Sequence, residues 1–417
     1  MHPFVGFGEA GRGEKGAGRD NESVNDSSTG WAASGLAWLT GFADGPPDHS
    51  RAAVATRAES LAARLSAAWR LRVDAGCLLT GRAALRGLHR AGRTSAGGAT
   101  RLLPTADGWC ALTLSRPDDI GAVPALVEAD DVPTDPWTTV TEWARTHASD
   151  AVLERAVLLD LPVARLGETA PGPPRNTPLG PASSPRAAAG LLVADLTSMW
   201  AGPLCGQLMA SAGATVVKVE SPHRPDGTRA GDRLFYDWIN QGKLSYAIDF
   251  DRDAARLKAL LAAADVVIEG SRPGALARRG LSPHALAGPP GRVWVRITGH
   301  GADSPRVAFG DDAAVAGGLV GASGTGPVFC GDAIADPLTG LETAVAVSDS
   351  LSRGGGELIE VVMSQVAATY AALPAEPAGG CEAAPPQPPP PAPPAAGLGD
   401  DNARVDALVA QKGVAPC

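Results

Sequence analysis

The sequence is poor in lysine and has no closely paired cysteines or histidines. Only five of its 36 basic residues are lysines, and the net charge is −9 over 417 residues. Such a chain lacks the basic face that contacts with nucleic-acid phosphates require, which argues against a nucleic-acid-binding function. The six cysteines include no CxxC pair and the seven histidines no HExxH motif. No metal site is therefore expected, and the thiols are predicted to be reduced.

Long apolar runs are also missing. No stretch approaches the roughly 20 apolar residues that a membrane span needs, and the N-terminus lacks the apolar core of a signal peptide. We therefore expect a cytoplasmic protein without membrane contact. No GxGxxG motif follows a predicted strand and no GxxxxGK(S/T) motif occurs. Neither a dinucleotide site nor a P-loop, and hence no nucleotide cofactor, is predicted.

Short apolar segments alternate with helical segments in the second half of the chain. The expected strands and the helices between them are 191–196, 203–212, 215–220, 245–250, 254–264, 265–270 and 292–299. This alternation is typical of an α/β fold, with a mostly parallel sheet and flanking helices. The first half predicts a smaller α+β domain, with helices at 57–69, 137–146 and 151–159 and a strand within 105–114.

Composition divides the chain into six parts. Glycine-rich polar residues indicate a disordered tail, and two proline-rich stretches indicate a linker and a spacer. The parts are a tail (1–29), a smaller domain (30–167), a linker (168–186), a large α/β domain (187–373), a proline-rich spacer (374–395) and a C-terminal segment (396–417). The last segment predicts one helix over 400–413, with Asp400 or Asp401 as N-cap and Gly413 at its end.

Several motifs of the large domain occur in a known order. The stretch 191–222 holds a strand, an Ala-Gly-Pro turn and GATVVKVE, and it is followed by NQGKLSYAIDF (240–250), DVVIEGSRPGAL (265–276), GDD (310–312) and IADPLTG (334–340). In this order the chain resembles the class III CoA-transferases, which include formyl-CoA transferase, carnitine CoA-transferase and alpha-methylacyl-CoA racemase. The resemblance implies an enzyme that handles acyl-CoA and a carboxylate acceptor, with coenzyme A as substrate.

The remaining motifs of that family stand in an unusual order. SGLAWLTG (34–41), RLLPTADGWCAL (101–112) and residues 135–164 resemble the family's smaller domain, yet they precede the large domain. Residues 396–413 resemble the family's closing helix, with Asp401 where the family has histidine. The chain therefore looks rearranged. Because family members form interlocked dimers, the resemblance implies a homodimer or a heterodimer with a homologue.

The IADPLTG segment places Asp336 where the family has its catalytic aspartate. A carboxylate there attacks the thioester carbonyl, expels the CoA thiolate and forms a mixed anhydride. Asp336 precedes a predicted helix over 338–351, whose backbone N–H groups are expected to keep it ionised. Gly340, one turn on, is expected to leave room for the substrate. The alternative, that Asp336 only caps this helix, stays open.

Cations are expected to hold the phosphates of coenzyme A. The resemblance assigns Lys243 to a CoA contact and Arg278 to a phosphate contact, and Arg272 lies in the adjoining RPG turn. Asn240, in the same turn as Lys243, and Ala201, in the Ala-Gly-Pro turn, complete the expected cofactor-binding residues. An arginine fork matches the geometry of a phosphate.

Two other functions remain open from the sequence. In the racemase branch the second residue of the GDD triplet is a histidine that pairs with the catalytic aspartate, whereas here it is Asp311. His300 is the nearest alternative base. A catalytically silent CoA-binding subunit is the other alternative, because Trp200, Gly270 and Ser271 depart from the family's pattern. The smaller domain's glycine-rich loop is represented by residues 96–98.

Overall fold

The computed structural model describes residues 30–131, 133–376 and 382–413. The predicted tail over 1–29 lies outside these residues, as do 377–381 of the predicted spacer and the last four residues.

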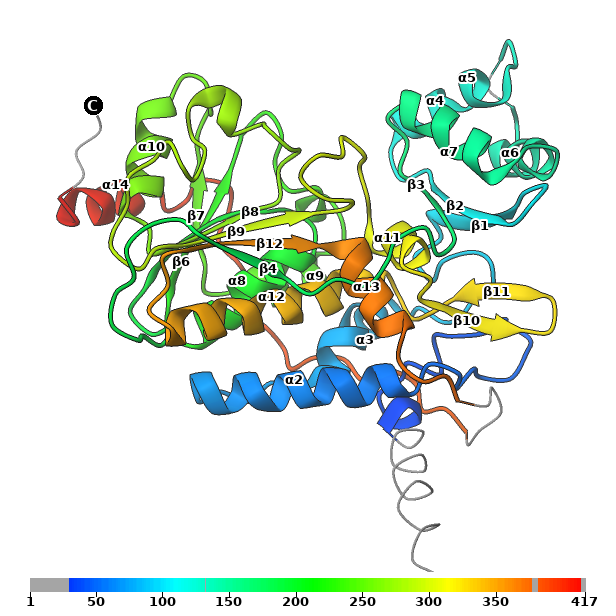
Figure 1. The fold of residues 1–417 in the computed structure, drawn as a ribbon, viewed down its shortest axis with the longest axis horizontal. Helices are drawn as coiled ribbons and strands as arrows, with labels where there is room; N and C mark the ends of the chain where they lie inside the picture. Colours follow the sequence, from blue (N-terminus) through cyan, green and yellow to red (C-terminus); the bar gives the residue numbers. More distant parts are fainter. Residues whose placement is uncertain (1–29, 132, 377–381, 414–417) are drawn as a thin grey trace, which may run out of the picture.

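A seven-stranded sheet forms the centre of the described chain (Figure 1). Its order is β4-β12-β9-β8-β5-β6-β7; all neighbours are parallel except edge strand β4, which runs antiparallel to β12. The bounds are β4 (Arg175–Pro178), β5 (Leu192–Leu196), β6 (Thr215–Glu220), β7 (Leu244–Ala247), β8 (Val266–Glu269), β9 (Val293–Thr298) and β12 (Glu357–Val362). The four residues of β8 are all buried, as expected for a parallel strand covered on both faces. The predicted α/β class is confirmed.

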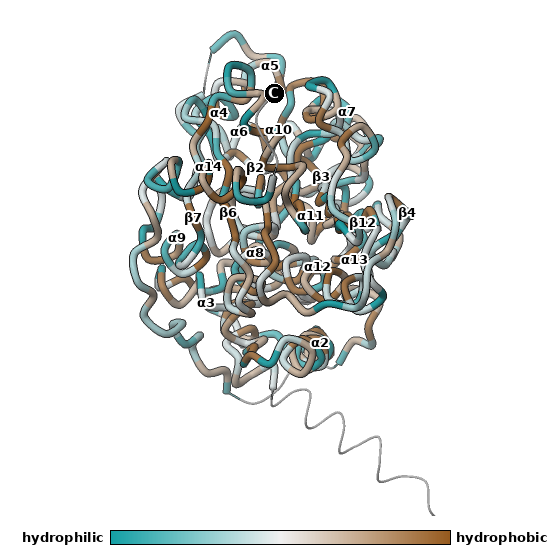
Figure 2. Tube along the Cα trace, turned by 90° about the vertical axis from the view of Figure 1, so that its left-hand side faces the viewer, coloured by the Kyte–Doolittle hydropathy of each residue, from teal (hydrophilic) through white to brown (hydrophobic). Residues whose placement is uncertain are grey.

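Helices cover both faces of this sheet (Figure 1). One face carries α8 (Ala201–Ser211), α9 (Arg233–Asn240), α12 (Ala335–Ser352) and α13 (Met363–Ala371), and the other carries α10 (Ala254–Ala263) and α14 (Asn402–Gln411). Each face has its own hydrophobic core. Hydrophobic residues lie mainly along the inner elements and hydrophilic ones along the peripheral loops (Figure 2). The described residues also form two short 3-10 helices, η1 (Gly227–Arg229) and η2 (Ala277–Arg279).

The N-terminal half contributes to two separate cores. Helices α2 (Ala53–Trp69) and α3 (Ala75–Arg86) join the core of the large sheet, and α2 packs along α12. A second core lies between a three-stranded sheet and its helices: β1 (Thr100–Pro104), β2 (Trp109–Thr113), α4 (Pro117–Gly121), α5 (Val123–Val127), α6 (Pro136–Arg145), α7 (Ser149–Leu158) and β3 (Val163–Arg165). The segment that the sequence groups as 30–167 is thus shared between both bodies.

A small junction core joins the three-stranded sheet to the rest of the chain. It includes Leu102 and Ala111 from β1 and β2, Val315 from α11 (Gly310–Ala316), and Val320 and Phe329 from the hairpin of β10 (Val320–Ser323) and β11 (Gly326–Phe329). Thr100 of β1 and Thr113 of β2 also contact Asp311 and Asp312 in the first turn of α11. The GDD triplet occupies that turn.

The predicted linker and spacer are partly ordered in the structure. Residues 175–178 of the predicted linker form β4, which pairs with β12. Residues 382–395 form neither a helix nor a strand. At their end, the Ala395 N–H donates to Asp237 Oδ1 on α9. The predicted C-terminal helix is confirmed as α14, but Asp401 does not cap it with its side chain. Instead, Asp401 Oδ2 accepts a hydrogen bond from the Ser245 N–H.

Two further sequence expectations bear on the described residues. The four cysteines there, Cys77, Cys110, Cys205 and Cys330, are free thiols. Within the described ranges, the helices are either too short or too polar to cross a membrane.

Candidate active site

Asp336 lies in the first turn of α12, with its carboxyl directed at the start of α11. The Gly310 N–H donates to Asp336 Oδ2 at 3.1 Å, and among the described residues this is its only side-chain hydrogen bond. In the part of the chain that the structure describes, no side chain caps α12. The alternative that Asp336 serves as the helix cap is therefore contradicted. Asp336 is partly exposed and has no ion-pair partner in the described chain, which leaves one oxygen free.

Backbone geometry around Asp336 is unusual. Ala333 has φ +43°, a left-handed value that residues with a side chain rarely adopt, and it follows Gly331 at φ +68°. The Ala333 N–H donates to Asp311 Oδ1 at 3.0 Å, which ties this turn to α11. A Cβ at Gly310 would overlap the Ala333 carbonyl oxygen and Asp336 Oδ2. Strained backbone of this kind costs about 1–3 kcal/mol and is concentrated at functional sites.

Three carboxyl groups meet at this turn: Asp311, Asp332 and Asp336. Asp332 is fully buried, and its Oδ1 lies 2.8 Å from Nη1 of Arg82 on α3. Burial raises the pKa of Asp336 to about 7, helped by the charges of Asp311 and Asp332 and opposed by Arg82 and the Gly310 N–H. The expectation that backbone N–H groups keep this carboxyl fully ionised is therefore wrong, because desolvation outweighs them. Burial likewise raises the pKa of Asp311 to about 6.

A chain of hydroxyl groups connects Asp311 to Asp312. Thr100 Oγ1 lies 3.3 Å from Asp311 Oδ2 and 2.9 Å from Thr113 Oγ1, which lies 3.1 Å from Asp312 Oδ1. Two hydroxyl protons cannot fill three contacts, so one carboxyl of the pair must carry the third proton. Asp312 fits this role, because its side chain is fully buried and burial raises its pKa to about 8.

Replacing Asp312 with asparagine is expected to stabilise the chain at alkaline pH. A folded-state pKa of about 8 exceeds the value of about 4 in the unfolded chain. The folded chain then holds a proton that the unfolded chain has released, so wild-type stability falls as the pH rises between these values. Asparagine keeps an acceptor for the Phe309 N–H, which now bonds Oδ1, and cannot ionise. We expect the free energy of unfolding at pH 8 to increase by at least about 1.4 kcal/mol, the equivalent of one pKa unit.

Urea unfolding of Asp312→Asn and the wild type at pH 5 and pH 8 measures this change. The variant should show the smaller difference between the two pH values. The same pH dependence in both proteins would show that Asp312 is ionised in the folded chain.

Lys243, the predicted CoA contact, is buried, and other residues of the chain surround its ammonium group. Its Nζ donates to Asp195 Oδ2 at 2.9 Å, to the Pro203 carbonyl at 2.7 Å and to Asn240 Oδ1 at 3.1 Å. These acceptors use all three protons of the ammonium group. Burial alone would raise the pKa of Asp195, but the charges of Lys243 and Lys218 hold it below its usual value. A phosphate could reach Lys243 only after one of these bonds broke.

The other predicted cofactor residues are spread over three places. Asn240 is buried, where its amide donates to the Tyr236 carbonyl at 3.1 Å in addition to accepting from Lys243. Arg272 is exposed and pairs with Asp160 at 2.5 Å. Arg278 is exposed as well, and its guanidinium has no hydrogen-bond or ion-pair partner within the described ranges. It is the predicted cation that stands free for a ligand phosphate.

The turn at Ala201 packs against α12 rather than bordering open space. A Cβ at Gly340 would lie 2.7 Å from the Ala201 carbonyl oxygen. The glycine thus allows close approach of α8, and the expectation that it makes room for substrate is wrong. Trp200 is buried, in an edge contact with Phe235 at 5.3 Å, and its Nε1 has no partner in the described part of the chain.

His300 is a poor alternative base. Burial lowers its pKa to about 3, assisted by the charge of Arg306. Its imidazole is therefore neutral at physiological pH and supplies no cation. Among the described residues, no group of three or more histidine, cysteine or acidic side chains has the arrangement of a metal site.

The sequence does not predict that Arg82 lies at this site. Its helix, AGCLLTGRAALR, has the composition of an ordinary packing helix, and no motif marks the arginine. Its partner is 250 residues further along the chain, so only the fold reveals the contact. Gly97, in the stretch that resembles the family's glycine-rich loop, lies close to this pair: a Cβ there would lie 3.4 Å from Arg82 Nη2 and 3.9 Å from Asp332 Oδ1.

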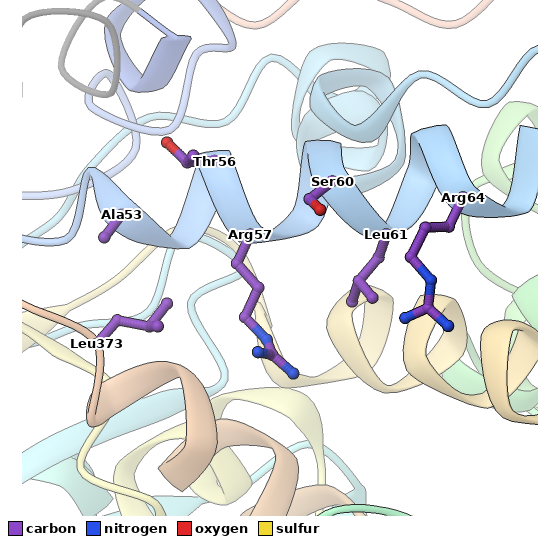
Figure 3. Close-up of a pocket in the computed structure, with 7 residues that line it drawn as sticks. All are labelled: Ala53, Thr56, Arg57, Ser60, Leu61, Arg64 and Leu373. Atoms are coloured by element: carbon purple, nitrogen blue, oxygen red, sulfur yellow. The ribbon is translucent and has the colours of Figure 1, made fainter. Parts of the chain in front are cut away.

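A separate groove runs along α2 (Figure 3). It measures about 440 Å³ and is lined by Ala53, Thr56, Arg57, Ser60, Leu61, Arg64 and Leu373. Arg57 pairs with Glu342 at 2.9 Å and Arg64 with Asp349 at 3.2 Å, both on α12. None of the predicted site residues lines it, and its two cations are already neutralised.

Comparisons with known proteins match the second half of the chain. Residues 189–389 match the model of CoA-transferase family III. The succinyl-CoA–D-citramalate CoA-transferase of Chloroflexus aurantiacus is 31% identical over 199 residues, covering 42% of this chain and 49% of that protein. The succinate–glutarate CoA-transferase of Agrobacterium fabrum is 32% identical over 203 residues, covering 42% of this chain and 51% of that protein. The chain spans about half the length of the curated relatives it matches.

Solved structures match the same share of the chain. A CAIB/BAIF family protein from Brucella suis is 28% identical with a TM-score of 0.41, over 45% of this chain and 56% of that one. A hypothetical protein from Mycobacterium tuberculosis is 28% identical with a TM-score of 0.39, over 45% and 56% respectively.

Proposed function

We propose that the chain moves coenzyme A from an acyl-CoA to a carboxylic acid through an anhydride on Asp336, because residues 189–389 match the model of CoA-transferase family III. The observation that carries this proposal is the state of Asp336. Asp311 and Asp336 are both partly exposed and have no ion pair in the described chain. Both oxygens of Asp311 accept hydrogen bonds, whereas one oxygen of Asp336 is free. Its neighbour Asp332 is buried and bound to Arg82.

The proposed reaction is a series of nucleophilic substitutions at acyl carbons, and it needs no external acid or oxidant. An Asp336 oxygen attacks the thioester carbon, the C–S bond breaks, and the CoA thiolate leaves an acyl-aspartyl anhydride. The thiolate then attacks Cγ of Asp336, which releases the donor acid and leaves an aspartyl-CoA thioester. The acceptor carboxylate repeats these two steps in reverse order. It forms a new anhydride and then departs as its CoA ester, and Asp336 is restored.

The groups around Asp336 suit the charge changes in these steps. The Gly310 N–H already donates to a carboxyl oxygen of Asp336 and would remain beside the oxyanion that forms at Cγ. A pKa of about 7 lets Asp336 act both as an ionised nucleophile and as a leaving group. For the coenzyme, the unpaired guanidinium of Arg278 favours a phosphate contact, with Arg272 nearby in sequence.

Capture of the intermediate tests the proposal. The protein is incubated with succinyl-CoA, the donor named for the Chloroflexus relative, and quenched with hydroxylamine. Mass spectrometry is expected to find a hydroxamate on Asp336 and on no other carboxyl group. Related CoA thioesters extend the donor series. Protein that binds these thioesters yet never gives the adduct would be the silent CoA-binding subunit instead.

A racemase or epimerase is the second candidate. Asp311 lies in the same carboxyl cluster, and burial raises its pKa to about 6, which suits proton transfer near neutral pH. Exchange of the α-proton of an acyl-CoA for deuterium, without transfer of CoA to an added acid, would favour this reaction.

The proposal also covers the oligomeric state and the cellular location of the protein. We expect a homodimer, or a heterodimer with a homologue, acting in the cytoplasm. One relative is named as the beta subunit of a succinyl-CoA–L-malate CoA-transferase, so multisubunit members exist among the similar proteins.

A further inference from the structure

Arg82 is the cation in direct contact with the carboxyl cluster, as far as the described residues go. It comes from α3, outside residues 189–389, and binds Asp332 at 2.8 Å. Its charge acts on all three aspartates and lowers the pKa that burial would otherwise give Asp311, Asp332 and Asp336. Arg86, one turn further on, acts on Asp332 through its charge but forms no hydrogen bond or ion pair with the three aspartates within the described residues.

The guanidinium of Arg82 is positioned by two aromatic rings and by Asp332, and it keeps N–H groups that form no hydrogen bond within the described residues. Its Cζ lies 5.5 Å from the ring centre of Trp200 and 5.7 Å from that of Phe235. One of its nitrogens binds Asp332, while the others have no hydrogen-bond partner within the described ranges. The side chain keeps one-fifth of its surface exposed. A planar fork with unused N–H groups beside a glycine turn at Gly97 is suited to bind a small planar anion.

A second unused donor lies beside this fork. Trp200 is 97% buried, and its indole N–H lacks an acceptor in the described part of the chain. A buried donor without an acceptor costs free energy, which a bound ligand oxygen would recover. Asp332 Oδ2 is likewise buried without a partner in the described part of the chain. The partly exposed fork of Arg82 is the unused group that a ligand oxygen can reach.

The chemistry at Asp336 supplies such a ligand. When the acceptor acid attacks, Asp336 is an uncharged CoA thioester, and the acid must bring its carboxylate next to Asp311 and Asp332, whose negative charges repel it. A cation at the same place removes this obstacle. Resting on the function proposed above, we infer that Arg82 binds the carboxylate of the acceptor acid and presents its second oxygen to Cγ of the Asp336 thioester. That oxygen then forms the new C–O bond as the CoA thiolate leaves.

Isotope exchange tests this role with an acid that a protein active on succinyl-CoA must accept. Succinyl-CoA is the donor and labelled succinate the acceptor, because the acid released in the forward half-reaction must re-enter in the reverse one. Arg82→Gln is expected to raise the KM for labelled succinate about 10- to 100-fold. Formation of the Asp336 hydroxamate from succinyl-CoA alone, at about pH 8.5 where Asp336 stays ionised, should change less than about threefold. Arg82→Lys should restore part of the exchange.

Arg72→Gln is the matched control, since it removes an exposed arginine that lies just before the same helix and has no hydrogen-bond or ion-pair partner in the described chain. It should leave both rates unchanged. Two results would overturn the inference and leave the Asp336 proposal standing. One is that folded Arg82→Gln loses hydroxamate formation and isotope exchange to the same extent. The other is that its KM for succinate is unchanged. Absence of the hydroxamate in the wild type would overturn both.

Discussion

Asp336→Asn is expected to lower CoA transfer at least about 1,000-fold, because asparagine cannot attack a thioester and no other carboxyl group replaces it. Asparagine retains an oxygen for the Gly310 N–H, so the turn between α11 and α12 should survive. Initial rates of transfer from succinyl-CoA, together with thermal unfolding, separate lost chemistry from lost folding. A folded variant that keeps even one-tenth of the activity would contradict the assignment of the nucleophile.

The control for this substitution is Asp303→Asn. Asp303 is exposed and has no hydrogen-bond or ion-pair partner in the described chain. Its replacement removes the same charge from the molecule without touching the cluster. Activity within about twofold of the wild type is expected, since an exposed unpaired charge is well screened.

The pH dependence of the wild type should report the same carboxyl group. Asp336 attacks only when ionised, and burial raises its pKa to about 7. Hydroxamate formation should therefore increase about tenfold per pH unit below that value and level off above it. An aspartate with an ordinary pKa of about 4 would give a flat profile over the same range. A profile without an inflection near neutrality would mean that another group attacks the thioester.

Much of the large domain could be predicted from the sequence. The strands β5, β6, β8 and β9 are short apolar runs between helical segments, and such runs have few alternatives to a parallel sheet. Strand β4 could not be found this way, because its residues RNTP lie in a proline-rich stretch and form a strand only by pairing with β12. Pairing with a distant edge is a tertiary effect that local composition does not encode.

The site shows the same division. Asp336 could be located by its motif, because IADPLTG keeps its spacing whatever the rest of the chain does. Arg82 could not, since its role depends on a contact across 250 residues. The motif also locates Gly340, but the prediction that this glycine makes room for substrate is wrong. A glycine allows the close approach of a helix, here α8, as readily as that of a substrate. A motif fixes which residues are present but not which neighbour fills the space beside them.

Lys243 offers the sharpest test of that distinction, through an expected loss of stability. It was assigned to coenzyme A by resemblance, whereas the fold surrounds it with Asp195, Asn240 and the Pro203 carbonyl. Lys243→Met keeps much of the side chain's volume and removes its charge, so Asp195 is left buried and unpaired. Breaking one side of a buried pair costs about 3–5 kcal/mol. Urea unfolding measures this loss, and Lys258→Met, which changes an exposed lysine of α10, should cost less than about 0.5 kcal/mol.

The double variant Asp195→Asn, Lys243→Met decides what the lysine does beyond folding. Removing both charges together should recover a large part of the lost stability, because no uncompensated ion stays in the core. If Lys243 has a structural role alone, the recovered protein binds acyl-CoA with an unchanged KM. If the lysine also reaches the coenzyme, the KM for acyl-CoA stays raised in a protein that folds normally. Undiminished stability of the single variant would instead show that the ammonium group leaves Asp195 readily, as a ligand contact requires.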